Sequence, residues 1–492
     1  MNYLIGLDIG TQGTKGAIYD ASMREIATSF APSRLVSPEP GVVWQEPDEM
    51  LAGAVEVIKA LASTVDPSDI AAIGLDGQMA GIMGIDARGE ASTVYDSWLD
   101  MRCGECATSM LKIAGNRATE LSGGQLTYVH APKMLWWKNT YPEAYAKTAR
   151  FVLPHAYIVG RMCNLDCEGA YYDYTHLHFS CLADNEKKAW SRELCDIFGL
   201  DMAKLPRIAS PFEVVGKVSP SFAAESGLVS GTPVVAGAGD TAASTFGAGL
   251  FSPGVILDIA GTASVLAGGV DYFAPDVKNH TLTMMRSPVD GLYAPLSYIA
   301  GGGLCVRWLR DVLASDYGKL EAEASDIPPG SEGLMFVPHF SGRVLPNNPK
   351  LKGAFLGLDF KHTRAHMYRA VLESVAYEYA YYLDILKSLY PSQSFSVIKA
   401  MGGGSKSKLF NRIKSEVLGI PYAPFESGDT ALTGSAVIAG CGVGLIDDYA
   451  GVINSTISYR ERIEPRGEIS KIYAPFAERY LNAIDVITTF GG

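Results

Sequence analysis

Two short turns rich in glycine and threonine stand where chemistry on a phosphate group could take place. The first is Asp8-Ile-Gly-Thr-Gln-Gly-Thr-Lys15, and the second contains Gly261-Thr262. Glycines let backbone N–H groups approach an anion closely, and carboxylate oxygens are hard ligands of the kind that bind Mg²⁺. We therefore expect phosphate contacts from Thr11, Thr14 and Lys15 and a metal contact from Asp8. The chain has no GxxxxGK[ST] motif, so these turns do not belong to a P-loop enzyme.

The two turns lie in sequences that repeat each other about half a chain apart. Residues 7–11 read Leu-Asp-Ile-Gly-Thr, and residues 257–262 read Leu-Asp-Ile-Ala-Gly-Thr. Each follows an apolar stretch and precedes another, which predicts a hairpin in each half of the chain. A five-residue repeat can arise by chance, but two equivalent hairpins favour a duplicated domain. We predict an N-terminal domain over 1–247 and a C-terminal domain over 248–492.

The elements around these turns have the pattern of a mixed α/β protein. Short apolar runs that end in Gly or Asp alternate with longer helical periods. A helix is expected to begin near Pro47-Asp48, because proline suits the first turn and aspartate favours the helix dipole there. Strands are expected at residues 3–7, 16–19, 70–75, 82–85, 233–236, 255–259, 334–337 and 397–401.

Asp240 is the residue best placed to accept a proton. It follows a predicted strand and the glycines Gly237 and Gly239, and it precedes a helix of small residues. A carboxylate so placed can act as a general base toward a substrate hydroxyl, or it can simply cap the helix. The run 237–242 also imitates a dinucleotide fingerprint. A carboxylate inside that glycine turn would repel a pyrophosphate, which argues against a nicotinamide dehydrogenase.

A run of three glycines forms a third possible ligand site. The segment Met401-Gly-Gly-Gly-Ser-Lys-Ser-Lys408 follows a predicted strand and opens a helical pattern. Bare backbone at a helix start leaves room for a phosphate or a flat ring; a flexible loop is the alternative. Weaker candidates for a polyol site are Trp98, Asp100 and Arg102, which a salt-bridged helix start would explain equally well. His155, His176 and His178 show no consistent ligand spacing, so we expect structural roles for them.

Composition limits the classes of protein that fit. The 492 residues carry a net charge of −12, which argues against a nucleic-acid binder or a basic membrane-surface protein. The N-terminus lacks a signal-peptide pattern and no apolar run reaches the roughly 18 residues of a membrane span, so we expect a cytoplasmic protein without membrane partners. Eight cysteines, among them Cys103/Cys106 and Cys163/Cys167, lack the shared spacing of a metal site, and reduced thiols are expected.

Taken in order, these segments resemble the FGGY family of carbohydrate kinases over essentially the whole chain. The matching pieces are DIGTQGTK, IGLDGQMAGIM, SWLDMRC, APKMLWW, GAGDTAAS, GTAS, AGGGLCVRWLRD, MGGGSKS and the long stretch that begins PHFSGRVLPNNPKLKGAF. The resemblance implies an α/β fold of two RNase H-like (actin-like ATPase) domains with a catalytic cleft between them. It also implies ATP and Mg²⁺ as cofactors and a small-molecule sugar as substrate, and it leaves a homodimer open.

The resemblance assigns roles position by position. Asp240 matches the general base and Asp8 the Mg²⁺-associated carboxylate, with Asp240 also near the metal. The ATP-side positions are Thr11, Thr14, Lys15, Gly261, Thr262, Gly303, Arg307, Gly403, Gly404 and Ser407. The sugar-side positions are Met79, Ala80, Trp98, Tyr128, Asp240 and Thr241.

Two departures weaken the choice of sugar. Within the family the chain looks most like the xylulose kinases, yet these usually have His where this chain has Ala80 and Asn where it has Thr241. A lost polar contact to a buried sugar hydroxyl is worth about 1–3 kcal/mol. A kinase for another ketose, a deoxy sugar or a polyol therefore stays open. So does a catalytically silent sugar sensor, although the retained Asp8 and Asp240 speak against it.

Overall fold

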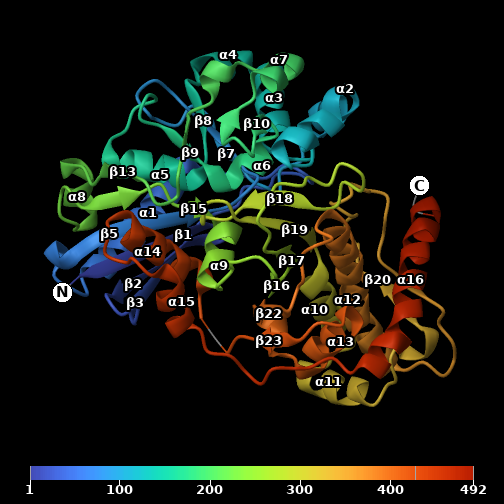
Figure 1. Ribbon diagram of the computed structural model, residues 1–492. Coiled ribbons are helices and arrows are strands. Elements are labelled where there is room, and N and C mark those ends of the chain that lie inside the picture. The colour runs from blue at the N-terminus through green and yellow to red at the C-terminus, as the bar shows by residue number, and fades with distance from the viewer. Residues whose placement is uncertain (1, 427, 491–492) are drawn as a thin grey trace. The chain divides into compact units, whose positions relative to one another are not determined.

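The computed structural model describes residues 2–426 and 428–490, which form two compact units (Figure 1). Unit 1 contains residues 1–251 together with the later segments 284–292 and 429–456, and unit 2 contains the ranges 252–283, 293–428 and 457–492. The predicted division into 1–247 and 248–492 describes continuous ranges, whereas the compact units are discontinuous, because helix α14 (Thr430–Gly442) packs on the sheet of unit 1. The expectation of a cleft between two domains stays a prediction.

Unit 1 is built on a mixed sheet. Its strands run in the order β13-β14-β5-β1-β2-β3, and β15 also pairs with β5. β1, β5 and β14 are parallel, whereas β1, β2 and β3 form an antiparallel meander. The bounds are β1 (Tyr3–Gly10), β2 (Gly13–Asp20), β3 (Glu25–Pro32), β5 (Ile70–Gly77), β13 (Val214–Lys217), β14 (Pro233–Val235) and β15 (Ala238–Gly239).

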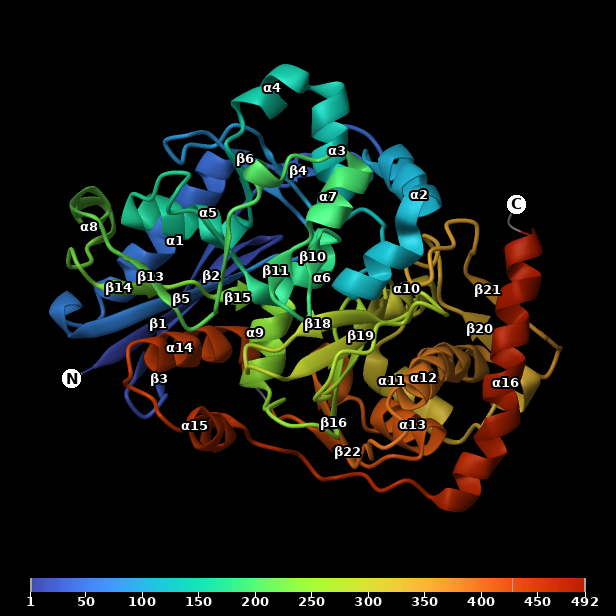
Figure 2. The same cartoon turned by 45° about the horizontal axis from the view of Figure 1, so that its top comes forward.

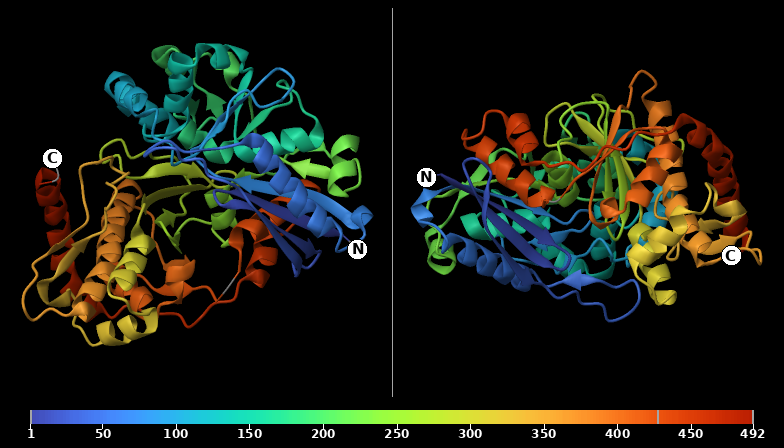
Figure 3. Two further views of the ribbon diagram at one scale, coloured as in Figure 1. Left: turned by 180° about the vertical axis from the view of Figure 1, so that it is seen from behind. Right: turned by 90° about the horizontal axis from the view of Figure 1, so that it is seen from below.

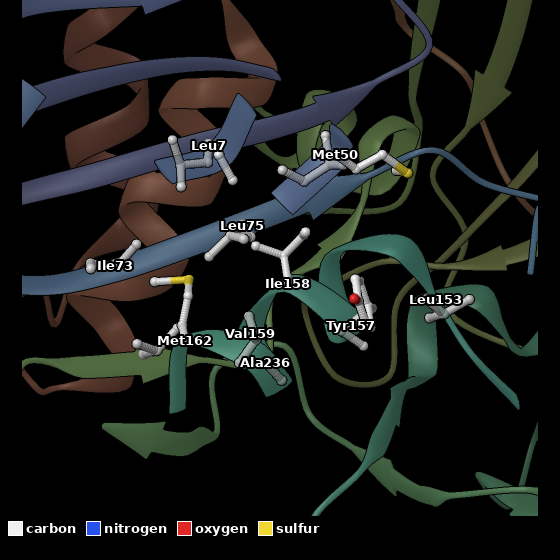
Figure 4. Close-up of a cluster of buried hydrophobic side chains, with 14 of the residues drawn as sticks. Leu7, Met50, Ile73, Leu75, Leu153, Tyr157, Ile158, Val159, Met162 and Ala236 are labelled. Carbon is white, nitrogen blue, oxygen red and sulfur yellow. The ribbon is translucent and has the colours of Figure 1, made fainter. Parts of the chain in front are cut away.

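Helices cover both faces of this sheet (Figure 2). One face packs against α1 (Pro47–Ala62) and α5 (Pro154–Cys163), and the other against α14. The core between the sheet and α5 includes Leu7, Leu75 and Ile158 (Figure 4). On the other face Gly6 and Gly74 let α14 approach, because a Cβ at either would lie 2.2–2.3 Å from a carbonyl oxygen of α14.

The remaining elements of unit 1 surround this sheet. They are β4 (Trp44–Gln45), β6 (Met83–Ile85), β7 (Tyr95–Asp96), α2 (Gly104–Ser122), α3 (His130–Thr140), α4 (Pro142–Lys147), β8 (Arg150–Val152), β9 (Tyr171–Asp173), α6 (Leu177–Ser180), β10 (Ala183–Asp184), β11 (Ala189–Trp190), α7 (Arg192–Phe198), β12 (Arg207–Ala209), α8 (Pro220–Ser226), α9 (Asp240–Gly247) and α15 (Tyr449–Thr456).

Unit 2 holds a second mixed sheet. Its strands run in the order β19-β17-β16-β22-β23, with β16 and β17 antiparallel and β16 and β22 parallel. Helix α16 lies beside α12 and α13 (Figure 3). The bounds are β16 (Val255–Ala260), β17 (Ser264–Gly268), β19 (Tyr293–Ile299), α10 (Gly302–Val312), α11 (Tyr317–Ser325), β20 (Met335–Val337), β21 (Ala354–Leu356), α12 (Arg364–Leu389), β22 (Val397–Met401), α13 (Lys408–Leu418), β23 (Tyr422–Pro424) and α16 (Gly467–Phe490); β18 (Thr283–Arg286) spans the boundary at residue 284.

The structure confirms the element pattern expected from the sequence. Every predicted strand overlaps an observed one, the helix begins at Pro47, and the repeated Leu-Asp-Ile segments form the hairpins β1–β2 and β16–β17. Of the helices in the described part of the chain, none is long and apolar enough to cross a membrane.

Candidate active site

The first hairpin presents Asp8 near the end of β1. In β1–β2, Gly10 pairs with Gly13, so Thr11 and Gln12 form a tight turn directly beyond Asp8. The side chain of Asp8 is half-buried, and within the described chain its Oδ1 has no hydrogen-bond partner. A Cβ at Gly10 would lie 3.5–3.6 Å from the Asp8 carboxylate oxygens, so this glycine keeps the approach to them open. The hairpin therefore offers a hard oxygen ligand.

Three carboxylates gather where parallel strands of this sheet end. Asp8 is the register partner of Asp76 on β5, and Asp76 is also the partner of Ala238 on β15, two residues before Asp240. Burial and then the negative charge of Asp240 raise the pKa of Asp8 to about 7. Burial and then the charge of Asp8 raise the pKa of Asp76 well above its ordinary value, while Ser435 Oγ donates to Asp76 Oδ2 at 2.6 Å.

This cluster fits a divalent cation. Lys15, the lysine whose charge acts on Asp8, already pairs with Asp429, so it does not neutralise the negative charge of Asp8 and Asp240. Carboxylates without a cationic partner and an unpaired carboxylate oxygen are what a Mg²⁺ site requires.

Asp240 is the first residue of α9, with Gly239 as the N-cap. The alternative role of helix cap therefore falls to Gly239. Asp240 Oδ1 accepts hydrogen bonds from Thr241 N at 2.5 Å and Thr241 Oγ1 at 3.0 Å. Burial raises the pKa of Asp240, and the two bonds from Thr241 oppose that rise. Thr241, predicted to contact the sugar, is thus engaged in orienting the carboxylate.

The sugar-side residues are linked to the first hairpin by hydrogen bonds. Trp98 Nε1 donates to Thr11 Oγ1 at 3.0 Å, and Thr11 Oγ1 donates to Gln78 Oε1 at 3.0 Å. Met79 is buried, and it packs so closely on Gly239 that a Cβ there would lie 2.6 Å from its Cε. The structure thus brings Thr11, Trp98 and the 78–79 segment together.

Two other predicted sugar-side positions have distinct settings. Ala80 has a positive φ of 62°, a backbone conformation that costs a non-glycine residue energy. Tyr128 is half-buried and lies against Gly104 at the start of α2.

Two predicted phosphate contacts of the first hairpin have other partners within unit 1. Thr14 is buried, with its Oγ1 facing Gly53 of α1, so it lies on the face of the sheet opposite to Asp8. Lys15 is the register partner of Asp8 and shares its face, but its charge pairs with Asp429. The sequence motif alone could not reveal these partners, because both come from segments outside the hairpin.

A pocket in unit 2 gathers the other predicted ATP positions. Its volume is about 630 Å³. The predicted residues that line it are Gly261, Thr262, Gly303, Arg307, Gly403, Gly404 and Ser407. Tyr317, Glu321, Tyr368, Lys406 and Phe410 also line it. Lys406 lies in the glycine-rich segment 401–408 but was not singled out, and sequence reasoning missed the other four because no motif marks them as ligand contacts. An apolar pocket with a few polar groups is the usual form of a small-molecule site.

The second hairpin differs from the first in its charge. Asp258, the repeat of Asp8, is fully buried and paired with the buried Lys414, and Tyr379 Oη donates to Asp258 Oδ1 at 2.8 Å. The charge of Asp258 is therefore paired inside unit 2, whereas Asp8 Oδ1 has no hydrogen-bond partner among the residues that the structure describes.

The cysteines stay outside these sites. All eight are free thiols, and the two pairs noted in the sequence, Cys103/Cys106 and Cys163/Cys167, belong to no metal-ligand cluster of the described residues.

The chain combines two mixed α/β units, as in the actin-like ATPase fold, with an Asp8 oxygen that lacks a hydrogen-bond partner among the described residues and with a pocket of about 630 Å³ in unit 2. A carboxylate for a metal ion and a pocket for a nucleotide are the parts that a phosphotransferase needs. The FGGY carbohydrate kinase N-terminal domain matches residues 3–247, and the C-terminal domain of the same family matches residues 267–443. The chain belongs to the FGGY family of carbohydrate kinases and is a carbohydrate kinase.

Individual relatives cover almost the full chain. A xylulose kinase of Bacillus subtilis (strain 168) is 24% identical over 488 residues, which is 98% of this chain and 96% of the relative. A gluconokinase of Bacillus licheniformis is 24% identical over 501 residues, 98% of this chain and 95% of the relative. The crystal structure of the xylulose kinase from Rhodospirillum rubrum matches with a TM-score of 0.90 and 25% identity over 100% of both chains.

The mixed order of the first sheet also argues against a dehydrogenase. A dinucleotide-binding sheet is built of parallel strands, but here the central strand β1 continues into the antiparallel meander β2–β3. The glycine run at 237–242 instead leads through Gly237, at φ +76°, into the short helix α9.

Proposed function

We propose that this kinase transfers the γ-phosphoryl group of Mg-ATP to a primary hydroxyl of a small sugar, with D-xylulose as the first candidate. The observation that carries the proposal is the group of carboxylates at the ends of β1, β5 and β15, in which Asp8 keeps an unpaired oxygen beside the charge of Asp240.

Asp240 is the base of the proposed mechanism. It accepts the proton of the substrate hydroxyl as that oxygen forms its bond to the γ-phosphorus, and the bond from phosphorus to the β-phosphate oxygen breaks to release ADP. Thr241 holds the carboxylate in place through its two hydrogen bonds. Because phosphoryl transfer has a loose transition state, positioning and charge stabilisation supply most of the rate.

Asp8, together with Asp240, would hold Mg²⁺, which when bound neutralises charge on the phosphates. The pocket of unit 2 would hold the nucleotide, with Gly261 and Thr262 near the phosphates and Gly403 and Gly404 against the adenosine. Arg307 and Lys406 are cations that line the pocket and suit the phosphates.

D-xylulose is favoured because xylulose kinases recur among the relatives, in sequence and in structure. Gluconokinases match at comparable identity, and Ala80 and Thr241 depart from the usual xylulose kinase residues. With alanine at position 80, the chain lacks the histidine ring that usually follows Met79 in xylulose kinases. The hydroxyl of Thr241 already donates a hydrogen bond to Asp240. We therefore keep gluconate, other ketoses and polyols as the alternatives.

Two measurements test the proposal. ADP release is measured with D-xylulose, D-ribulose, D-fructose, gluconate, glycerol, xylitol and erythritol, and D-xylulose is expected to give the highest kcat/KM. In Asp240→Asn, which keeps the shape of the side chain, kcat is expected to fall by about 10³-fold or more with sugar affinity retained. Near-wild-type turnover of Asp240→Asn would refute the base assignment. Flat activity across the panel would favour a silent sugar sensor.

A further inference from the structure

A buried polar cluster lies around Asp173, at the end of β9. Asp173 Oδ1 accepts hydrogen bonds from Thr175 N, at 3.0 Å, and from Thr175 Oγ1. Asp173 Oδ2 accepts one from His176 Nδ1 at 2.7 Å, and His155 Nε2 lies 3.1 Å from the same oxygen. All four side chains are fully buried. The sequence offered no role for this cluster beyond structural histidines.

Thr175 connects this cluster to the segment that carries Asp240. The N–H of Gly239 donates to Thr175 Oγ1 at 3.0 Å. Because the Thr175 hydroxyl donates to Asp173, its lone pair is left to face the N–H of Gly239. Gly239 ends β15 and caps α9, so this single bond fixes the backbone directly before Asp240.

We propose that Thr175, anchored by Asp173, is a positioning residue for Asp240, which it serves by holding the N–H of Gly239. The inference rests on the proposed role of Asp240 as the base. A clamp matters because Asp240 is the first residue of α9 and directly follows Gly239, so a shift of the Gly239 backbone would move the carboxylate away from the hydroxyl that it deprotonates. A displacement of about 1 Å in such a group costs on the order of 10²-fold in rate.

A metal ion is the other use that these side chains allow. His155, Asp173 and His176 each place one ligand atom within 4.8 Å of the others. Against a metal, His176 Nδ1 already serves as a hydrogen-bond donor to Asp173, and Asp173 Oδ1 already accepts two bonds from Thr175. The hydrogen-bonded arrangement satisfies the carboxylate without an ion.

The test compares Thr175→Val, which keeps the shape of the side chain and removes the hydroxyl, with Thr175→Ser, which restores it. In Thr175→Val, kcat is expected to fall by about 10- to 100-fold, while KM for sugar and for ATP changes by less than about 3-fold. Thr175→Ser is expected to recover at least about a third of kcat. Thr245→Val is the matched control, because Thr245 is a buried threonine of α9 whose hydroxyl donates to Ala242 O at 3.0 Å. It should lose some thermal stability and keep kcat.

Each result separates the inference from the proposed function. If Thr175→Val folds and keeps its kcat while Asp240→Asn is inactive, the role of Thr175 is refuted and the role of Asp240 as the base stands. If Asp240→Asn is active, the proposed base itself is refuted. If Thr175→Val does not fold, Asp173→Asn, which weakens the anchor of Thr175, should show the same loss of kcat with unchanged KM. Metal analysis of the purified protein adds a readout independent of activity. One bound transition-metal equivalent that is lost in His155→Gln would overturn the hydrogen-bond account, and its absence supports it.

Discussion

Replacing Asp8 by asparagine should stabilise the ligand-free protein while it abolishes activity. Burial and the charge of Asp240 raise the pKa of Asp8 from 3.8 to about 7. Each pKa unit corresponds to about 1.4 kcal/mol, so an ionised Asp8 costs at most about 4 kcal/mol, and solvent access to this half-buried group reduces that to roughly 1–3 kcal/mol. The asparagine of the Asp8→Asn variant would remove the cost because it carries no charge.

The pH dependence follows from the direction of the shift. Below about pH 4 Asp8 is protonated in both the folded and the unfolded chain, so the variant gains nothing there. As the pH rises toward 7, the unfolded chain ionises Asp8 freely and the folded one does not, so wild-type stability is progressively lost relative to Asp8→Asn. The difference should grow between about pH 4 and pH 7 and then stay constant to about pH 8. Added MgCl₂ should close it by stabilising only the wild type.

Urea unfolding in EDTA measures this difference in unit 1. Five of the six tryptophans, Trp44, Trp98, Trp136, Trp137 and Trp190, belong to unit 1, so their fluorescence follows that unit. The matched control is Asp258→Asn, which changes the equivalent residue of the second hairpin and leaves Lys414 buried without its partner. That variant should be destabilised by about 3–5 kcal/mol, measured by circular dichroism. Equal or lower stability of Asp8→Asn at about pH 8, or a pH-independent gap, would refute the reasoning.

Three further substitutions test the pocket of unit 2, the packing of α14 on the first sheet and the bond between Thr241 and Asp240. Gly303→Ala would place a Cβ 2.0 Å from the carbonyl oxygen of Gly261 in the pocket of unit 2, so KM for ATP should rise by about 10-fold or more. Gly403→Ala is the control, because its Cβ meets no described atom within 4 Å, and it should raise KM for ATP less. A larger rise in Gly403→Ala than in Gly303→Ala, measured by steady-state kinetics, would contradict this prediction. Gly74→Ala should lower the free energy of unfolding by about 2–4 kcal/mol, because its Cβ would lie 2.2 Å from the backbone of α14. Gly160→Ala in helix α5 should leave that free energy unchanged or raise it, because the added Cβ meets no described atom within 4 Å. Thr241→Val should lower kcat by about 3- to 10-fold with sugar KM unchanged, since one of two bonds to the neighbouring carboxylate is lost; a selective rise in sugar KM would return Thr241 to a substrate-contact role.

The sequence was sufficient for the features that depend on neighbouring residues. Hairpin β1–β2 could be predicted because Gly10 and Gly13 stand at its turn between two apolar strands. The helix after Asp240 followed from its small residues in the same way. The pocket of unit 2 was anticipated in part, since its glycine-rich turns carry recognisable motifs.

Features that depend on the return of a distant segment were beyond the sequence. Lys15 pairs with Asp429, which lies 414 residues further along the chain. Asp76 accepts a hydrogen bond from Ser435, which lies 359 residues further along. No periodicity encodes that return, so the sequence could not show that Lys15 pairs with Asp429, and its contact with phosphate stays a prediction. Thr175 was missed for the same reason, because the role that we propose for it depends on a hydrogen bond from Gly239, 64 residues further along the chain.

The repeated Leu-Asp-Ile segments show how far a shared local sequence decides chemistry. Both fold into the same strand and turn, since that outcome needs only apolar residues and a glycine. The two aspartates nevertheless differ in their surroundings, because helix α13 supplies Lys414 to the second hairpin, whereas the first hairpin lies beside Asp76 and Asp240. A carboxylate among carboxylates attracts a cation, and one paired with a lysine stabilises a core. The two hairpins thus share a backbone, and their neighbouring side chains suit Asp8 to metal binding and Asp258 to holding the core of unit 2, while the turn after Asp258 still lines the pocket.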